Sequence, residues 1–265
     1  MDLRVNAGSP LHPVEVDLLC VFAEVEAPFP LEIPASGQSD VEQRDLFRSA
    51  REQLTERGLA DEGGPLGVAE DFVFLLRSCT GVVDMVLAKE ELTLAAAVLV
   101  HRDEALLVTQ DLASPEQMIR MKAATLDEAL DDLVRLVPRA EVPLTAPFSL
   151  PRRSLEAAFE ALTAREEPLM PQEVDEVLRS QGIDDRVSRR MVSLLQPVLG
   201  NGQVGIARRD ETEEQWQRVG DELRWLDTER GRFRLAGDAD WMSVNPLPRD
   251  EIRAEIRKLA LKARG

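Results

Sequence analysis

Residues 82–109 read VVDMVLAKEELTLAAAVLVHRDEALLVT, and this stretch decides the fold class. It contains three apolar runs, which are separated by the charged segments 89–91 and 102–104. Short runs rich in Val and Leu with charged breaks between them are typical of β-strands joined by tight turns. The stretch therefore predicts an antiparallel meander.

The first two of these runs are apolar on both faces of their strands, except for Asp84 in the first run and Thr93 in the second. An antiparallel sheet commonly has one face in contact with solvent, so this pattern needs a cover on each face. Two interpretations stay open. Helices of the same chain cover both faces, or part of the apolar surface binds a partner protein.

Helical patterns flank the meander. An extended piece is predicted over 14–16 and a helix over 17–24, followed by a proline-rich extended segment. The segment 39–58 begins with a capping box and ends at a glycine, which predicts a helix. A helix over 68–79 has an apolar residue at every third or fourth position. A second capping box begins a closing helix over 125–137.

The second half repeats this order of elements. The stretch 138–151 contains four prolines and no clear period, so it is interpreted as a joint between two halves. Helices are predicted first, from Leu155, from Pro171 to Gly182, and from Val187 to Val198 with a kink or an early end at Pro197. Strands are then predicted over 203–208, 222–227, 232–236 and 241–244, and a closing helix from Pro248 to Ala263.

The two closing helices have the same apolar spacing, with Leu126, Leu130, Leu133, Val134 and Val137 in one and Ile252, Ile256, Leu259, Ala260 and Ala263 in the other. The predicted fold class is therefore α+β, with two halves related by a quasi-twofold. Each half contains helices, an antiparallel β-meander and a closing helix. The halves are residues 1–138 and 139–265, and we expect them to form one compact unit.

Composition excludes several classes of function. The chain has 265 residues, with 32 basic and 49 acidic side chains, and its net charge is −17. This charge argues against nucleic-acid binding, which depends on Lys and Arg. No apolar run approaches the roughly 20 residues of a membrane span, and the N-terminal segment has no basic region of a secretion signal. We expect a cytoplasmic protein without membrane insertion, in which Cys20 and Cys79 are buried thiols.

Residues 200–205 match the pattern G-x-G-x-x-G, but they lie between a predicted helix and a predicted strand. Dinucleotide binding requires the opposite order, so a helix C-cap and a turn are predicted here. The two histidines, His12 and His101, do not have the spacing of metal ligands. We expect no cofactor, no metal and no catalytic residue.

The C-terminal strands carry a recognisable pattern. Residues 225–233 read WLDTERGRF, and Trp241, Val244 and Pro246 follow before the last helix. Asp227, Thr228 and a glycine in this order predict a β-hairpin. Together with Pro28-Phe29-Pro30-Leu31 and the helix end over 51–59, this pattern resembles the EspG family of actinobacterial type VII secretion chaperones.

The resemblance implies an α+β fold with a quasi-twofold, and a cytosolic chaperone that neither binds a cofactor nor catalyses a reaction. It implies binding of PPE proteins, usually as PE–PPE heterodimers, through the apolar helical tip of the PPE protein. The chaperone keeps this partner soluble and targets it for secretion. We expect a monomer or a weak dimer.

Combined with the apolar strands, the resemblance predicts a binding face made of the sheet and the second-half helices. The candidate contact residues are Met85, Leu87, Leu94, Ala96, Leu195, Val198, Arg232 and Arg234. Two alternatives remain. One is an acidic decoy that regulates a basic partner, and the other is an enzyme without a recognisable motif.

Overall fold

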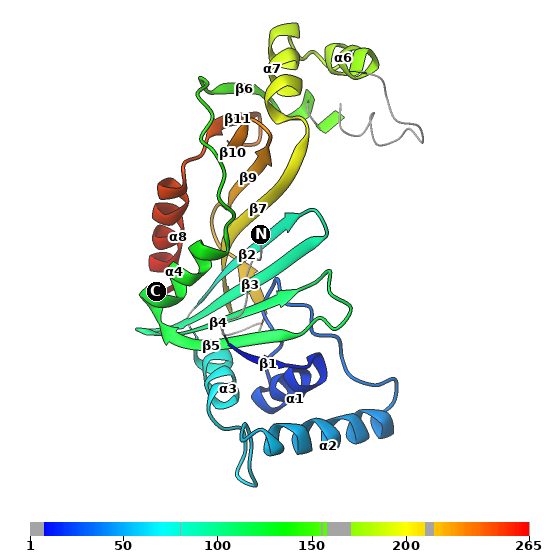
Figure 1. The fold of residues 1–265 in the computed structure, drawn as a ribbon, viewed down its shortest axis with the longest axis vertical. Helices are drawn as coiled ribbons and strands as arrows, with labels where there is room; N and C mark the ends of the chain where they lie inside the picture. Colours follow the sequence, from blue (N-terminus) through cyan, green and yellow to red (C-terminus); the bar gives the residue numbers. More distant parts are fainter. Residues whose placement is uncertain (1–7, 80, 155, 158–170, 210–214, 265) are drawn as a thin grey trace. The chain divides into compact units, whose positions relative to one another are not determined.

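A computed structural model describes residues 8–79, 81–154, 156–157, 171–209 and 215–264 (Figure 1). The chain divides into two compact units. The first consists of Met1–Pro138, Gln203–Glu222 and Arg253–Gly265, and the second of Arg139–Gly202 and Leu223–Ile252. Helices and antiparallel strands occur in both units, which confirms the α+β class. The quasi-twofold between the halves 1–138 and 139–265, and their union in one compact unit, stay predictions.

In the first unit, β2, β3, β4 and β5 form the antiparallel meander, and β1 pairs with β5, so these strands lie in the order β1-β5-β4-β3-β2. The expected strands over 82–109 are present, with Val83 opposite Val98 and Ala97 opposite Val108. A short strand outside this meander, β8, pairs with the end of β7. The elements are β1 (Ser9–Leu11), α1 (Pro13–Ala23), α2 (Asp40–Glu56), α3 (Val68–Ser78), β2 (Gly81–Lys89), β3 (Leu92–His101), β4 (Glu104–Asp111), β5 (Ile119–Thr125), α4 (Leu126–Leu136), β8 (Trp216–Arg218) and most of α8 (Arg249–Arg264).

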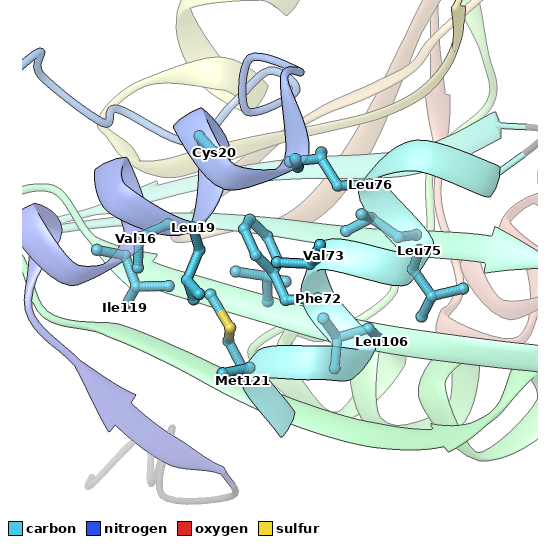
Figure 2. Close-up of a cluster of buried hydrophobic side chains, with 14 of the residues drawn as sticks. Val16, Leu19, Cys20, Phe72, Val73, Leu75, Leu76, Leu106, Ile119 and Met121 are labelled. Carbon is cyan, nitrogen blue, oxygen red and sulfur yellow. The ribbon is translucent and has the colours of Figure 1, made fainter. Parts of the chain in front are cut away.

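Helices cover both faces of this meander. One face packs against α1 and α3, where Leu19 and Phe72 meet strand residues such as Met121 (Figure 2). The neighbouring strand residue Lys122 points to the opposite face, and its Nζ binds Asp132 Oδ2 of α4 at 2.6 Å. β3 contacts α3 and α4, and most apolar residues of β2 and β3 are buried on both faces.

The start of α1 differs from the prediction. Residues 14–16 are helical, and the extended piece lies earlier, in β1. His12 is the N-cap: its Nδ1 accepts a hydrogen bond from the Val14 N–H at 3.3 Å, and Glu15 Oε2 accepts one from the His12 N–H at 2.7 Å. Pro13 at the first helical position also favours this start. Histidine is an uncommon N-cap, so the sequence pattern did not reveal it.

The second capping box is confirmed in detail. Glu128 N–H donates to Thr125 Oγ1 at 3.4 Å, and Thr125 N–H donates to Glu128 Oε2 at 3.0 Å. The helix α4 begins at the next residue, Leu126. This reciprocal pair satisfies two backbone donors that a helix start otherwise leaves without a partner.

The second unit has a four-stranded antiparallel sheet in the order β9-β10-β11-β6, covered by helices. Its core consists of Phe148, Leu150, Val177, Leu178, Ile183, Leu195, Phe233 and Val244. The helix predicted from Leu155 lies mostly outside the described residues. The elements are β6 (Phe148–Pro151), α6 (Pro171–Ser180), α7 (Asp185–Leu195), β9 (Leu223–Thr228), β10 (Gly231–Gly237), β11 (Trp241–Pro246) and the first part of β7 (Val198–Arg209).

The glycines at 200–205 lie inside β7, so the predicted helix C-cap and turn are wrong. Gly202 lies against the ring of Trp225, where an added Cβ would overlap the indole. Gly205 lies in the same way against the guanidinium of Arg218. These glycines leave room for large side chains on a strand, which explains the pattern without a nucleotide.

Candidate partner-binding surface

Four of the predicted contact residues belong to the core of the first unit. Met85 lies opposite Ala96, and Leu87 lies opposite Leu94, on paired positions of β2 and β3. All four have at most 3 % of their surface exposed. They are therefore not accessible in the free chain, and their role in binding a partner stays a prediction.

Arg232 is almost completely buried in the second unit. Its Nε lies 2.6 Å from Asp227 Oδ1 and its Nη2 lies 2.8 Å from Asp227 Oδ2. The guanidinium also lies 5.5 Å from the centroid of the Trp225 ring. This pair binds the two strands of the β9–β10 hairpin to each other, so Arg232 supports the hairpin from inside.

Arg234 is more accessible than Arg232. Its Nη1 donates to Glu251 Oε1 at 2.8 Å, and its side chain is partly exposed. The two arginines occupy the same face of β10, because their positions differ by two residues. Arg234 therefore remains available at the surface of the second unit.

The hairpin predicted over 225–233 is confirmed. Thr228 pairs with Gly231 at its end, and Gly231 has a φ of 116°, a backbone angle that favours glycine. Thr228 Oγ1 accepts a hydrogen bond from the Arg230 N–H at 3.1 Å and donates to the Leu194 carbonyl at 2.9 Å. The Thr228 side chain thus shapes the turn and joins it to the end of α7.

A segment that we call the strap, residues 139–147, passes over this hairpin. The Glu141 carbonyl accepts a hydrogen bond from the Arg232 N–H at 3.0 Å. An added Cβ at Gly231 would lie 2.5 Å from that carbonyl oxygen and 3.0 Å from Pro143 Cγ. Only glycine at position 231 therefore allows the strap to approach so closely. Arg190 of α7 also donates to Thr145 Oγ1 at 3.2 Å.

Exposed apolar side chains flank the same hairpin. Leu144 of the strap is fully exposed, and Val142 is 47 % exposed. Val198 and Leu199, at the start of β7, are each 44 % exposed. We call these four residues the strap surface. Leu195, in contrast, is part of the core of the second unit. The helical position predicted for Val198 is wrong, because α7 ends at Leu195, two residues before Pro197.

Of the strap surface, only Val198 was among the predicted contact residues. The strap has no helical or strand period, so periodicity gives no signal for Val142 and Leu144. Val142 and Leu144 could be identified from the sequence as apolar residues that lie between prolines in a segment without predicted secondary structure.

The described part of the chain contains no helix that is long and apolar enough to cross a membrane. Among the same residues, no three His, Cys, Asp or Glu side chains are grouped so that they would hold a metal ion. Cys20 and Cys79 are free and buried, and burial raises the pKa of each thiol to about 12.

The fold is shared with a solved structure. The chain matches the Mycobacterium tuberculosis type VII secretion system chaperone EspG5, solved in complex with the PE25–PPE41 dimer, with a TM-score of 0.66. The match covers 96 % of both chains at 10 % sequence identity. No curated protein sequence matches the chain. The sequence model of the EspG family, however, matches residues 12–258. Because this match spans nearly the whole chain, the protein is a member of the EspG family.

Proposed function

We propose that this protein is a type VII secretion chaperone that binds a PPE protein as part of a PE–PPE pair. The observation that carries the proposal is the family match over residues 12–258. The shared fold with EspG5, which was solved with the PE25–PPE41 dimer, supports the same function. The chaperone keeps the apolar tip of its partner out of water and delivers it for secretion.

We assign the first contact with the partner to the strap surface. Its four apolar side chains are exposed in the free chain, and they lie on segments that the β9–β10 hairpin supports. An apolar helical tip is covered best by such side chains at the centre of a contact, with polar groups around them. Arg234, at the surface of the same unit, supplies a polar group of this kind.

The remaining candidates have different roles in this proposal. Arg232 and Leu195 hold the hairpin and the end of α7 in place, and they act through their neighbours. Met85, Leu87, Leu94 and Ala96 become contact residues only if the cover over their sheet face moves when the partner binds.

The proposal includes no catalytic step, and it places the protein in the cytoplasm. Among the described residues, two buried carboxylates form ion pairs and two buried cysteines are protonated thiols. Asp84 forms an ion pair with Arg218, and Glu15 Oε1 lies 2.6 Å from Arg57 Nη2. The two thiols stay protonated at neutral pH, so they are poor nucleophiles.

Co-expression with the PE–PPE pair encoded in the same genome tests the function. We expect a soluble complex of the three proteins, and less soluble PPE protein when the chaperone is absent. The variant Leu144→Glu/Val198→Glu should lose the complex, because it places charges within the apolar contact. The control Val41→Glu/Leu261→Glu changes two exposed apolar residues of the first unit and should retain it. Failure of the wild-type chain to form any complex refutes the proposal.

The salt dependence of the complex separates this function from that of an acidic decoy. Binding through apolar side chains should change little between low and high salt, whereas binding through charges weakens steeply. A complex that dissociates at moderate salt would therefore favour the decoy.

A further inference from the structure

A second exposed apolar surface lies on the first unit. Val21 and Phe22, in the last turn of α1, are 53 % and 47 % exposed. Phe74 on the outer side of α3 is 47 % exposed, and Leu66, which precedes α3, is 37 % exposed. We call these four residues the Phe22–Phe74 surface. The inner sides of α1 and α3 pack into the core (Figure 2), so the two helices each have an apolar inner side and an exposed aromatic residue.

Specific contacts hold this surface together. Arg77, one turn after Phe74 on α3, donates through Nε to the Ala23 carbonyl at 3.0 Å and through Nη2 to the Phe22 carbonyl. Its guanidinium lies 5.7 Å from the centroid of the Phe22 ring. On the other side, the His101 ring of β3 contacts the Phe74 ring edge-on, with 5.6 Å between the two ring centroids. The two rings are therefore fixed in place while half of each stays in solvent.

Acidic residues surround these rings. The loop that carries Asp61 and Glu62 lies beside Phe22, because an added Cβ at Gly64 would be 3.5 Å from Phe22 Cζ. Asp61 Oδ1 accepts a hydrogen bond from the Gly64 N–H at 3.1 Å, which holds the acidic loop there. Glu70 lies one turn before Phe74 on α3 and is exposed.

The charges at the start of α3 also repel one another. The pKa of Asp71 is raised by burial and by the negative charges of Glu70 and Glu104. Two cations, Arg77 and Arg209, lie at the end of α3, where both donate to backbone carbonyls. The carboxylates lie at the other end, at the start of α3 and in the loop before it, so the Lys and Arg side chains of a basic partner would meet them there.

We propose that the Phe22–Phe74 surface docks a basic amphipathic helix of a second protein partner. Apolar side chains of this helix would cover Phe22 and Phe74, and its Lys and Arg residues would face the surrounding carboxylates. Helices and a loop form the surface, so it offers side chains and not a strand edge, which favours a helix as the bound segment. An anionic membrane is disfavoured, because the carboxylates would repel it.

This inference does not depend on the proposed function. The strap surface belongs to the second unit, and the Phe22–Phe74 surface lies entirely in the first. A chaperone with two such surfaces binds its cargo through one and a basic segment of another protein through the other.

A designed peptide tests the proposal on the full chain. The probe is a fluorescein-labelled helix of about 18 residues, or five turns, with Leu on one side and Lys on the other. We expect saturable binding by fluorescence anisotropy at physiological salt. Phe22→Ser/Phe74→Ser should weaken this binding about tenfold or more, since few residues carry most of the energy of a contact. Glu62→Lys/Glu70→Lys should weaken it as well.

Matched controls separate this surface from general attraction to an acidic protein. Val41→Ser/Leu261→Ser removes two other exposed apolar residues of the first unit and should leave the affinity unchanged. A peptide of the same composition with scattered Leu residues should bind at least about tenfold more weakly, because it has no apolar side. Circular dichroism checks that each variant is folded. If the Phe variant does not fold, the charge-reversal variant carries the test.

Three results would overturn the proposal. The first is no saturable binding of the amphipathic peptide to the wild-type chain. The second is equal affinity for the two peptides or for the Phe and wild-type proteins. The third is self-association of the chain through Phe22 and Phe74 that the peptide does not disturb, which would make a second copy the occupant.

Discussion

Asp227 on β9 and Arg232 on β10 lie directly opposite each other and form a two-point ion pair, with N–O distances of 2.6 and 2.8 Å. The pair lies within the sequence pattern that carries the family resemblance. The hairpin that it binds supports the strap and the end of α7, through Gly231 and Thr228. This pattern therefore maintains the scaffold of the strap surface.

Removal of Arg232 should destabilise the second unit strongly. Arg232→Ala leaves the Asp227 carboxylate, which is 14 % exposed, without its main partner. Breaking a buried pair from one side costs about 3–5 kcal/mol of the free energy of unfolding. Urea unfolding followed by tryptophan fluorescence measures this loss. Arg230→Ala on the same hairpin is the control, because Arg230 is exposed, and it should change stability by less than about 0.5 kcal/mol. Similar stabilities for the two variants would contradict the role assigned to Arg232.

Gly231 should be irreplaceable for two separate reasons. Gly231→Ala adds strain at a φ of 116° and a clash with the Glu141 carbonyl of the strap. The control Gly182→Ala has strain at a φ of 78°, but it has no atom within 4 Å of the added Cβ. The control should lose about 1 kcal/mol of stability, and Gly231→Ala clearly more. Equal losses would show that the strap does not contact Gly231 in solution.

Asp84 should make the stability of the protein depend on pH. Burial raises the pKa of Asp84 from 3.8 to about 6, although Arg218 acts in the opposite direction. The folded chain therefore holds this proton more tightly than the unfolded chain does. Ionisation of Asp84 then lowers the free energy of unfolding as pH rises from about 4 to about 6. A shift of about two pKa units corresponds to about 3 kcal/mol.

Comparison with Asp84→Asn isolates this effect from the other carboxylates. As pH rises from about 4 to about 7, the wild-type protein should lose up to about 3 kcal/mol of stability relative to the Asn variant. Arg218 keeps a second partner in the variant, since its Nε lies 3.0 Å from Glu222 Oε1. Asp40→Asn, at an exposed position of α2, should give a profile parallel to the wild type. If the stability of the wild type and of Asp84→Asn changed in parallel with pH, the raised pKa of Asp84 would be contradicted.

The two thiols should be unreactive in the folded protein. Alkylation by iodoacetamide requires the thiolate, and the pKa of both Cys20 and Cys79 is about 12. At about pH 8, mass spectrometry should detect almost no modified native chain and two modified sites after unfolding in urea. Rapid labelling of the native protein at either site would show that the core around α1 and α3 opens readily.

The meander, the capping box of α4 and the C-terminal hairpin were predictable from the sequence, because local spacing determines each of them. Thr125 and Glu128 illustrate this, since both partners of the cap lie within one helical turn. The capping box predicted at Ser39 is incomplete: Glu42 N–H donates to Ser39 Oγ at 3.3 Å, but Glu42 Oε2 accepts from the Gln38 N–H and not from that of Ser39.

The start of α1 at His12 was not predictable, because a histidine N-cap is rare. The glycines of β7 were misinterpreted. Glycine is needed there because the large side chains of Trp225 and Arg218 pack against the strand, and both residues are distant in the sequence.

The candidate binding residues were less predictable than the fold. Apolar character alone does not distinguish Leu94, which is buried, from Leu144, which is fully exposed. Exposure depends on which segments cover a position, and those contacts join distant parts of the chain. Arg232 shows the same limit, because its partner Asp227 could be recognised only from the hairpin register.

Isothermal titration calorimetry of this chain with its purified cognate PE–PPE dimer tests the central claim most directly. The account predicts saturable binding of one chaperone per dimer, with an affinity that changes little with salt. It also predicts at least about a tenfold loss of affinity in Leu144→Glu/Val198→Glu, and none in Val41→Glu/Leu261→Glu. The absence of binding by the folded wild-type chain to any PE–PPE dimer of its genome would contradict the account.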